Sequence, residues 1–72
     1  MDNEEVFSKE DQCIISCVQA VRELRLARTS LIKSSTDFVD TNQKASEAIQ
    51  KMIEGISGDI MLLEALIEAY KD

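Results

Sequence analysis

The most reactive side chains in the sequence are two thiols, Cys13 and Cys17, placed one helical turn apart. On a helix both would point the same way, so they could form a redox switch or half of a metal site shared between two subunits. A disulfide across a single helical turn fits the required geometry poorly. The chain also lacks histidine, the other common zinc ligand. We therefore expect two small, buried, reduced thiols, and neither a metal nor a cofactor.

Three arginines, Arg22, Arg25 and Arg28, form the only basic cluster, and their spacing winds slowly around a helix. The formal net charge of −6 and the scarcity of aromatic residues argue against nucleic-acid binding, which favours clustered cations and stacking platforms. Two interpretations remain open. The arginines pair with acids of a neighbouring helix, such as Glu47 and Glu54, or they dock onto an acidic patch of a partner protein.

The acidic and hydroxyl side chains show no catalytic pattern. The 14 acids are scattered, without the spaced carboxylate pair of a glycosidase or the loop of a calcium site. None of the serines has a visible activating base, and no glycine-rich phosphate loop is present. The sequence predicts no catalytic residues, and its function is expected to be binding rather than reaction.

The size of the chain points in the same direction. A single domain of 72 residues buries a modest share of its surface, and small domains often gain stability from association. The acidic amino terminus differs from a secretory signal, and no run of apolar residues is long enough to span a bilayer. We expect a cytoplasmic protein without membrane insertion that binds another helical protein or, when alone, forms a homo-oligomer. Two alternatives stay open: a small helical structural subunit of a larger coiled-coil assembly, or a self-associating regulatory or inhibitor protein.

The periodicity of apolar residues predicts an all-α fold, an antiparallel hairpin of two long helices. A flexible tail is expected over residues 1–7, and Ser8 is expected to cap a first helix over 9–33. Short polar residues then predict a turn over 34–40. A second helix is expected over 41–70, so the whole chain forms one domain.

The second helix has a start signal and an interior interruption. Asp40 stands three residues before Gln43, an arrangement like a capping box, and is expected to start the helix. Gly55 and Gly58 interrupt its interior. Three outcomes are open: a continuous helix whose glycines let a neighbouring backbone approach, a kink, or a break after which Asp59 caps a third helix.

Each helix has a stripe of apolar residues expected to face the other helix. Around Ile14, the first stripe holds Cys13, Cys17, Ala20, Val21, Leu24, Ala27 and Leu31. The second stripe holds Ala45, Ala48, Ile49, Met52, Ile53, Ile56, Ile60, Leu63, Ile67 and Tyr70. Because Arg28 falls within the first stripe, a simple parallel coiled coil is not expected.

Three apolar residues near the carboxyl end, Met61, Leu62 and Leu66, fall outside the second stripe and have no obvious cover within the chain. We predict that they anchor a partner. Ile15 and Leu26 lie nearly opposite the first stripe, and Arg25 belongs to the basic cluster. These three are further candidate partner-binding residues.

The stretch over residues 24–31 reads Leu-Arg-x-Ala-Arg-x-x-Leu, and Asp40 and Gln43 open a long second helix that ends in apolar and aromatic residues. This pattern resembles the small co-chaperones of bacterial type III secretion needle subunits. The resemblance implies a cytosolic helical hairpin that binds a larger, tetratricopeptide-like chaperone and, with it, keeps the needle subunit soluble before export. The chain departs from that family in its mid-helix glycines and its cysteine pair.

Overall fold

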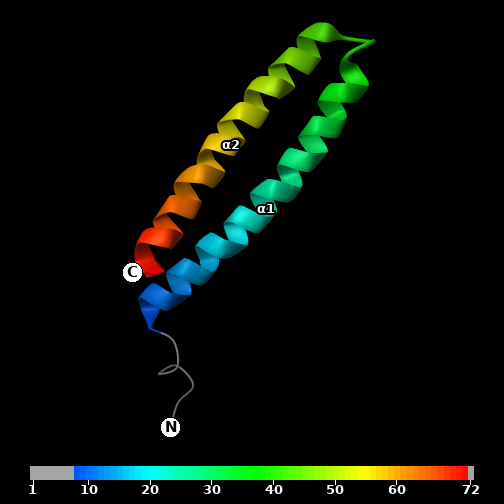
Figure 1. Cartoon of the computed structure of the whole chain (residues 1–72). Coiled ribbons are helices and arrows are strands. Elements are labelled where there is room, and N and C mark those ends of the chain that lie inside the picture. The colour runs from blue at the N-terminus through cyan, green and yellow to red at the C-terminus, as the bar shows by residue number, and fades with distance from the viewer. Residues whose placement is uncertain (1–7, 72) are drawn as a thin grey trace.

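The computed structural model describes residues 8–71, which form two α-helices joined by a short turn. Helix α1 spans Lys9–Phe38 and helix α2 spans Gln43–Lys71. The helices run antiparallel and pack along their length (Figure 1), which confirms the all-α hairpin predicted from the sequence. The tail expected over residues 1–7 lies outside the described residues.

The amino terminus of α1 begins with a capping box. The Ser8 hydroxyl accepts a hydrogen bond from the Asp11 amide at 3.1 Å, and the Asp11 carboxylate accepts one from the Ser8 amide at 3.3 Å. Both bonds satisfy amides that have no partner within the helix. Ser8 therefore caps the helix as predicted, and Asp11 supplies the reciprocal acceptor.

Helix α1 continues beyond the predicted end at residue 33, through the polar segment that was expected to form the turn. The Thr36 hydroxyl donates to the Ile32 carbonyl at 3.0 Å, and Lys33 pairs with Asp37 at 3.2 Å. Both contacts span four residues and so are compatible with helix. Ser35 is buried against α2. Tertiary packing therefore outweighs the preference of these polar residues for a turn.

The turn between the helices is shorter than predicted, and Asp40 is not the cap. The amides of Thr41 and Asn42 donate to the Phe38 carbonyl at 3.0 and 2.7 Å. The Asn42 side chain accepts from the Ala45 amide at 3.1 Å, three residues ahead. Asn42 therefore has the contact expected of an N-cap residue, two positions after the one predicted.

Helix α2 runs without a break through Gly55 and Gly58, so the third helix does not form, and its ribbon shows no sharp kink there (Figure 1). Both glycines have negative φ, and a Cβ built on either one meets no atom within 4 Å. Helix α1 therefore makes no close backbone approach at these positions, and that part of the prediction is wrong. The two glycines leave open space on the surface of the hairpin.

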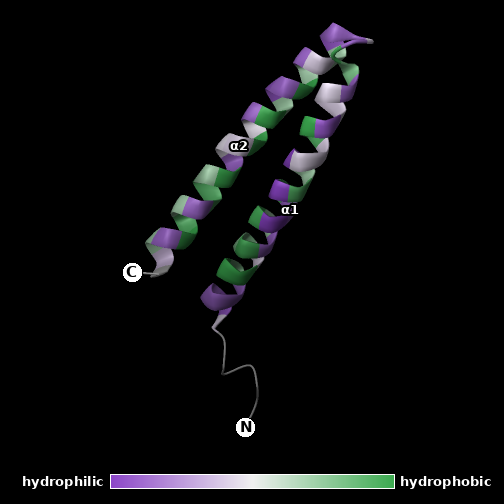
Figure 2. Ribbon diagram, turned by 45° about the vertical axis from the view of Figure 1, so that its right-hand side comes forward, coloured by the Kyte–Doolittle hydropathy of each residue, from purple (hydrophilic) through white to green (hydrophobic). Residues whose placement is uncertain are grey.

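The interface between the helices is narrow. Among the described residues, those that are buried are Val21, Ser35, Ser46 and Ile60. Half-buried residues extend this line at spacings of three and four, the pattern of a coiled-coil seam, and they include Arg28. Because only this narrow line faces the other helix, apolar and polar residues alternate along both helices (Figure 2). Five residues assigned to the core stripes are instead exposed: Cys13, Ala27, Ala48, Met52 and Tyr70.

A pair of serines fixes the register of the two helices near the turn. The hydroxyl oxygens of Ser35 and Ser46 lie 3.0 Å apart. Each hydroxyl also donates to the backbone carbonyl of the other residue, at 3.3 and 3.0 Å. Two heptads further from the turn, the same register places Val21 opposite Ile60, and these are the two apolar residues that are buried within the described part of the chain. The hairpin thus keeps one register from its turn to its open end.

Candidate protein-binding surfaces

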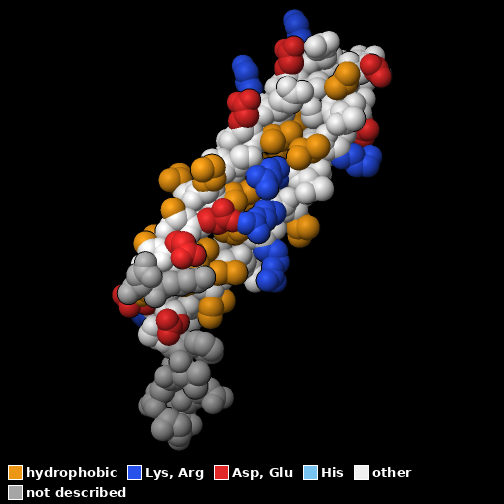
Figure 3. Space-filling view, viewed as in Figure 1, with side chains coloured by type: hydrophobic (Ala, Val, Ile, Leu, Met, Phe, Trp, Pro, Cys, Tyr) orange, Lys and Arg blue, Asp and Glu red, His pale blue; other side chains and the backbone are white. Residues whose placement is uncertain are grey.

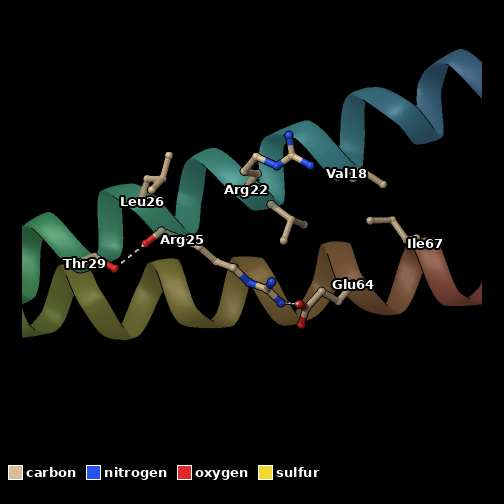
Figure 4. Close-up of a pocket in the computed structure, with 8 residues that line it drawn as sticks. Val18, Arg22, Arg25, Leu26, Thr29, Glu64 and Ile67 are labelled. Atoms are coloured by element: carbon tan, nitrogen blue, oxygen red, sulfur yellow. Dashed lines mark hydrogen bonds and ion pairs between the residues drawn. The ribbon is translucent and has the colours of Figure 1, made fainter.

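One side of the hairpin contains a groove between the helices (Figure 4). We call it the arginine groove. It is lined by Val18, Val21, Arg22, Arg25, Leu26, Thr29, Glu64 and Ile67. Apolar side chains from both helices line it together with two arginines, so it can accept an amphipathic chain segment better than a small polar ligand.

The three arginines have different surroundings. Arg25 forms an ion pair with Glu64 of α2, and Arg28 donates to the Ser57 hydroxyl at 3.2 Å. Among the described residues Arg22 has no hydrogen bond or ion pair, and its guanidinium points away from α2 (Figure 4). The intrachain interpretation is therefore correct for Arg25, but the acid is Glu64.

The ion pair of Arg25 with Glu64 lies at the surface, since the two side chains are 56% and 42% exposed. Exposed pairs of this kind contribute about 0–1 kcal/mol. The pair therefore adds little to the stability of the hairpin. Together with Arg22, it gives the middle of the groove its polar character.

The predicted anchors on α2 are all exposed, Met61 at 69%, Leu62 at 72% and Leu66 at 52%. At about 100° per residue, Leu62 and Leu66 fall on the side of α2 away from Glu64, whereas Met61 falls on the same side as Glu64. The three residues therefore do not form one patch. We call the side that carries Leu62 and Leu66 the leucine side.

The candidate residues on α1 lie on the other side of the molecule. Leu26 and Arg25 both line the arginine groove, and Ile15 is exposed one turn before Val18. Figure 3 shows this side, with basic side chains along the middle of α1 and hydrophobic side chains near them. The structure brings Leu26 and Arg25 together and separates both from Leu62 and Leu66.

Two regular side stripes emerge when the exposed residues are placed on the helices. The α1 side stripe is Ile15, Val18, Arg22, Arg25, Thr29 and Ile32. The α2 side stripe is Ala48, Met52, Gly55, Asp59, Leu62 and Leu66. Both follow alternating steps of three and four, as a second coiled-coil seam would. Val18, Ile32 and Met52 were not predicted as surface candidates, although this spacing in the sequence could have identified them.

The two thiols do not lie in one buried site. Cys13 is exposed and Cys17 is half-buried, and both are free. The expectation of two buried thiols was therefore wrong for Cys13. Cys17 lies in the interhelical seam, and Cys13, four residues earlier on the same face of α1, is exposed near the open end of the hairpin. Among the described residues, no group of three or more cysteine and acidic side chains is placed to hold a metal ion.

The open end of the hairpin brings Tyr70 near the start of α1. A hydrogen bond to the Glu10 carboxylate raises the pKa of the Tyr70 phenol from 10.0 to about 12, with smaller contributions from desolvation and from nearby anions. A carboxylate that accepts from the phenol stabilises its protonated form, and its negative charge disfavours the phenolate. The carboxyl end of α2 therefore lies close to the amino end of α1, in agreement with Figure 1.

No family model, curated protein or solved structure matches this chain. Over residues 8–71, neither helix has an apolar stretch of the length needed to cross a membrane. The functional proposal for this chain therefore rests on the arginine groove, the leucine side and the two side stripes.

Proposed function

We propose that this chain is a non-enzymatic protein-binding subunit that offers the leucine side of α2 to a helical partner. The observation that carries the proposal is the exposure of Leu62 and Leu66 on an ordered helix. Large exposed apolar side chains grouped on one side of a small domain mark interaction surfaces. The narrow interface between α1 and α2 adds support, because a hairpin with so few buried residues gains stability when a partner covers a second side.

The partner class follows from the resemblance to type III secretion co-chaperones. We propose a cytoplasmic complex with a tetratricopeptide-like chaperone that keeps a needle subunit soluble before export. A concave helical-repeat surface can accept one side of a long hairpin, with apolar side chains as anchors. In this assignment Leu62 and Leu66 lie at the centre of the interface, and Met61 lies at its edge.

A second candidate is a structural subunit of a larger coiled-coil assembly. The observation that favours it is the regular spacing of the two side stripes, which gives each helix a second seam. This candidate predicts that several helical chains bind at once, rather than a single chaperone.

Co-expression with the helical-repeat chaperone of a needle subunit tests the first proposal. We expect a stable complex with the wild-type chain and loss of the complex with Leu62→Asp, because a buried carboxylate without a partner is strongly unfavourable. Leu26→Asp places the same charge on an exposed leucine of the other side and is the matched control. Retention of the complex by Leu62→Asp and its loss with Leu26→Asp would assign the partner to the arginine groove instead.

A further inference from the structure

The two side stripes of the hairpin complement each other. We infer that a second copy of this chain packs its α2 side stripe, antiparallel, onto the α1 side stripe of the first copy. The contact joins two different surfaces, the arginine groove of one copy and the leucine side of the next.

The α1 side stripe is apolar at its ends and basic in its middle. Ile15, Val18 and Ile32 are exposed apolar side chains. Between them stand Arg22 and Arg25, and only Arg25 has an acidic partner within the described residues. A helix that covers this stripe must bring apolar residues to both ends and an acid to the level of Arg22.

The α2 side stripe has the opposite charge pattern. Met52 lies toward one end, and Leu62 and Leu66 lie toward the other. Asp59 stands between them, exposed and without an ion pair among the described residues. The α2 side stripe therefore has an acid between two apolar ends, whereas the α1 side stripe has arginines between two apolar ends. The two stripes are complementary in charge and alike in their apolar ends.

The register of the hairpin itself supports this pairing. In the register that sets Val21 opposite Ile60, each step toward the carboxyl end of α1 corresponds to a step toward the amino end of α2. If a second copy adopts the same register, Arg22 of the first copy lies opposite Asp59 of the second. The one unpaired arginine of the groove then meets an unpaired acid.

The same register also matches the side chains around this charge pair in size. Ile15 and Val18 of the first copy meet Leu66 and Leu62 of the second. Arg25, whose guanidinium bonds to Glu64 within its own chain, lies opposite Gly55 of the second copy. A Cβ at Gly55 would have no neighbour within 4 Å, so the glycine leaves room for the arginine. The contact thus explains why a residue without a side chain occupies position 55, which the isolated hairpin does not explain.

Two symmetric alternatives fit less well. Packing the leucine sides of two copies together with their turns at the same end brings Glu23 of one copy to the level of Asp59 of the other, and like charges facing across an interface are unfavourable. Packing the two arginine grooves together leaves Leu62 and Leu66 uncovered. The mixed contact covers both exposed apolar sets and pairs opposite charges.

The mixed contact leaves one free stripe on each of the two copies. Such a heterologous contact can add further copies until a ring closes or the chain of copies ends. We therefore expect the average mass of the protein to rise with concentration and to pass that of a dimer.

Sedimentation of the purified full chain, over a range of concentrations, tests this contact with charge reversals. Arg22→Glu and Asp59→Arg should each weaken association roughly tenfold or more, because each creates a like-charge pair. An equal mixture of the two variants should restore association, since every contact then pairs opposite charges. Lys51→Glu and Glu54→Arg make the same changes in net charge outside both stripes and should leave association unchanged.

Each other outcome overturns the proposal. A wild-type chain that stays monomeric at every concentration shows that the stripes do not bind each other. Association that survives Asp59→Arg but not Arg22→Glu indicates contact between arginine grooves, and the reverse pattern indicates contact between leucine sides. Failure of the mixture to recover, with both variants folded by circular dichroism, excludes the Arg22 to Asp59 pairing. Because the experiment contains no chaperone, its failure would leave the proposed chaperone complex standing.

Discussion

Near the turn, the two helices meet through hydroxyl groups, whereas toward the open end they meet through branched apolar side chains. Ser35 and Ser46 exchange hydrogen bonds close to the turn, and Gln50 donates to both hydroxyls at 3.4 and 3.5 Å. Val21 and Ile60 are buried two heptads away. Directional bonds specify one register, while apolar burial is less directional and supplies more free energy. The serines near the turn therefore specify the register of the two helices, and the apolar residues toward the open end supply most of the stability.

The largest effect on the free energy of unfolding is expected in the apolar region toward the open end of the hairpin. Ile60→Ala should lower the free energy of unfolding by about 2 kcal/mol or more, because it empties the most closely covered apolar position. Leu62→Ala, two residues away on an exposed side chain, should change it by no more than about 0.5 kcal/mol. Urea unfolding of the two variants measures both values. Equal losses would show that Leu62 belongs to the hairpin core.

The next largest effect on stability is expected at the two glycines of α2, which lie between the serine pair and Ile60. Gly55→Ala and Gly58→Ala should each stabilise the hairpin by about 1 kcal/mol, because alanine favours helix and its methyl group meets no neighbour. Thermal unfolding at low protein concentration isolates this effect from association, and Ala65→Gly should show the opposite sign. A loss of stability with Gly55→Ala at low concentration would mean that a neighbour occupies the space within the monomer.

Substitutions in the serine pair near the turn should change the free energy of unfolding less than Ile60→Ala does. Ser35→Ala should lower the free energy of unfolding by about 1 kcal/mol, since it removes one hydroxyl from a buried network. The double change Ser35→Ala with Ser46→Ala should lower it by less than the sum of the single changes, because either single change already removes the contact between the two hydroxyls. A double-mutant cycle measures this coupling. Full additivity would show that the two hydroxyls act independently.

The smallest expected effect is at the open end and depends on pH. The folded chain holds the Tyr70 proton more tightly than the unfolded chain, because the phenol pKa rises from 10.0 to about 12 beside Glu10. The resulting contribution to stability is present below pH 10 and is lost as the pH rises toward about 12. Ultraviolet titration of the phenolate should show a lower pKa in Glu10→Gln. An identical titration curve in that variant would exclude the carboxylate as the cause.

The fold was predictable because its main signals are local. The apolar spacing predicted two antiparallel helices, and Ser8 predicted the start of α1. The end of α1 was not predictable in the same way. Ser35 and Thr36 favour turns by their intrinsic chemistry, but Ser35 is held in the helix by its contact with Ser46, eleven residues further along the chain. A single-sequence pattern does not contain that contact.

The candidate surfaces were predictable in part. Leu62 and Leu66 stood out because they fall outside the core stripe, and both are exposed. Met52 was assigned to the core because the predicted stripe was too wide, and the observed seam is narrower than an apolar helix face in a globular domain. The ion pair of Arg25 with Glu64 required the register of the two helices, which the sequence alone did not fix.

We propose that the leucine side of α2 serves binding and not the stability of the hairpin itself. Leu62→Asp tests it when unfolding free energy and binding to the helical-repeat chaperone are measured on the same preparation. We predict an unfolding free energy within about 0.5 kcal/mol of the wild type, as for exposed substitutions in general, together with loss of the complex. A variant that binds the chaperone as tightly as the wild type, or one that loses binding only because the hairpin unfolds, would contradict the claim.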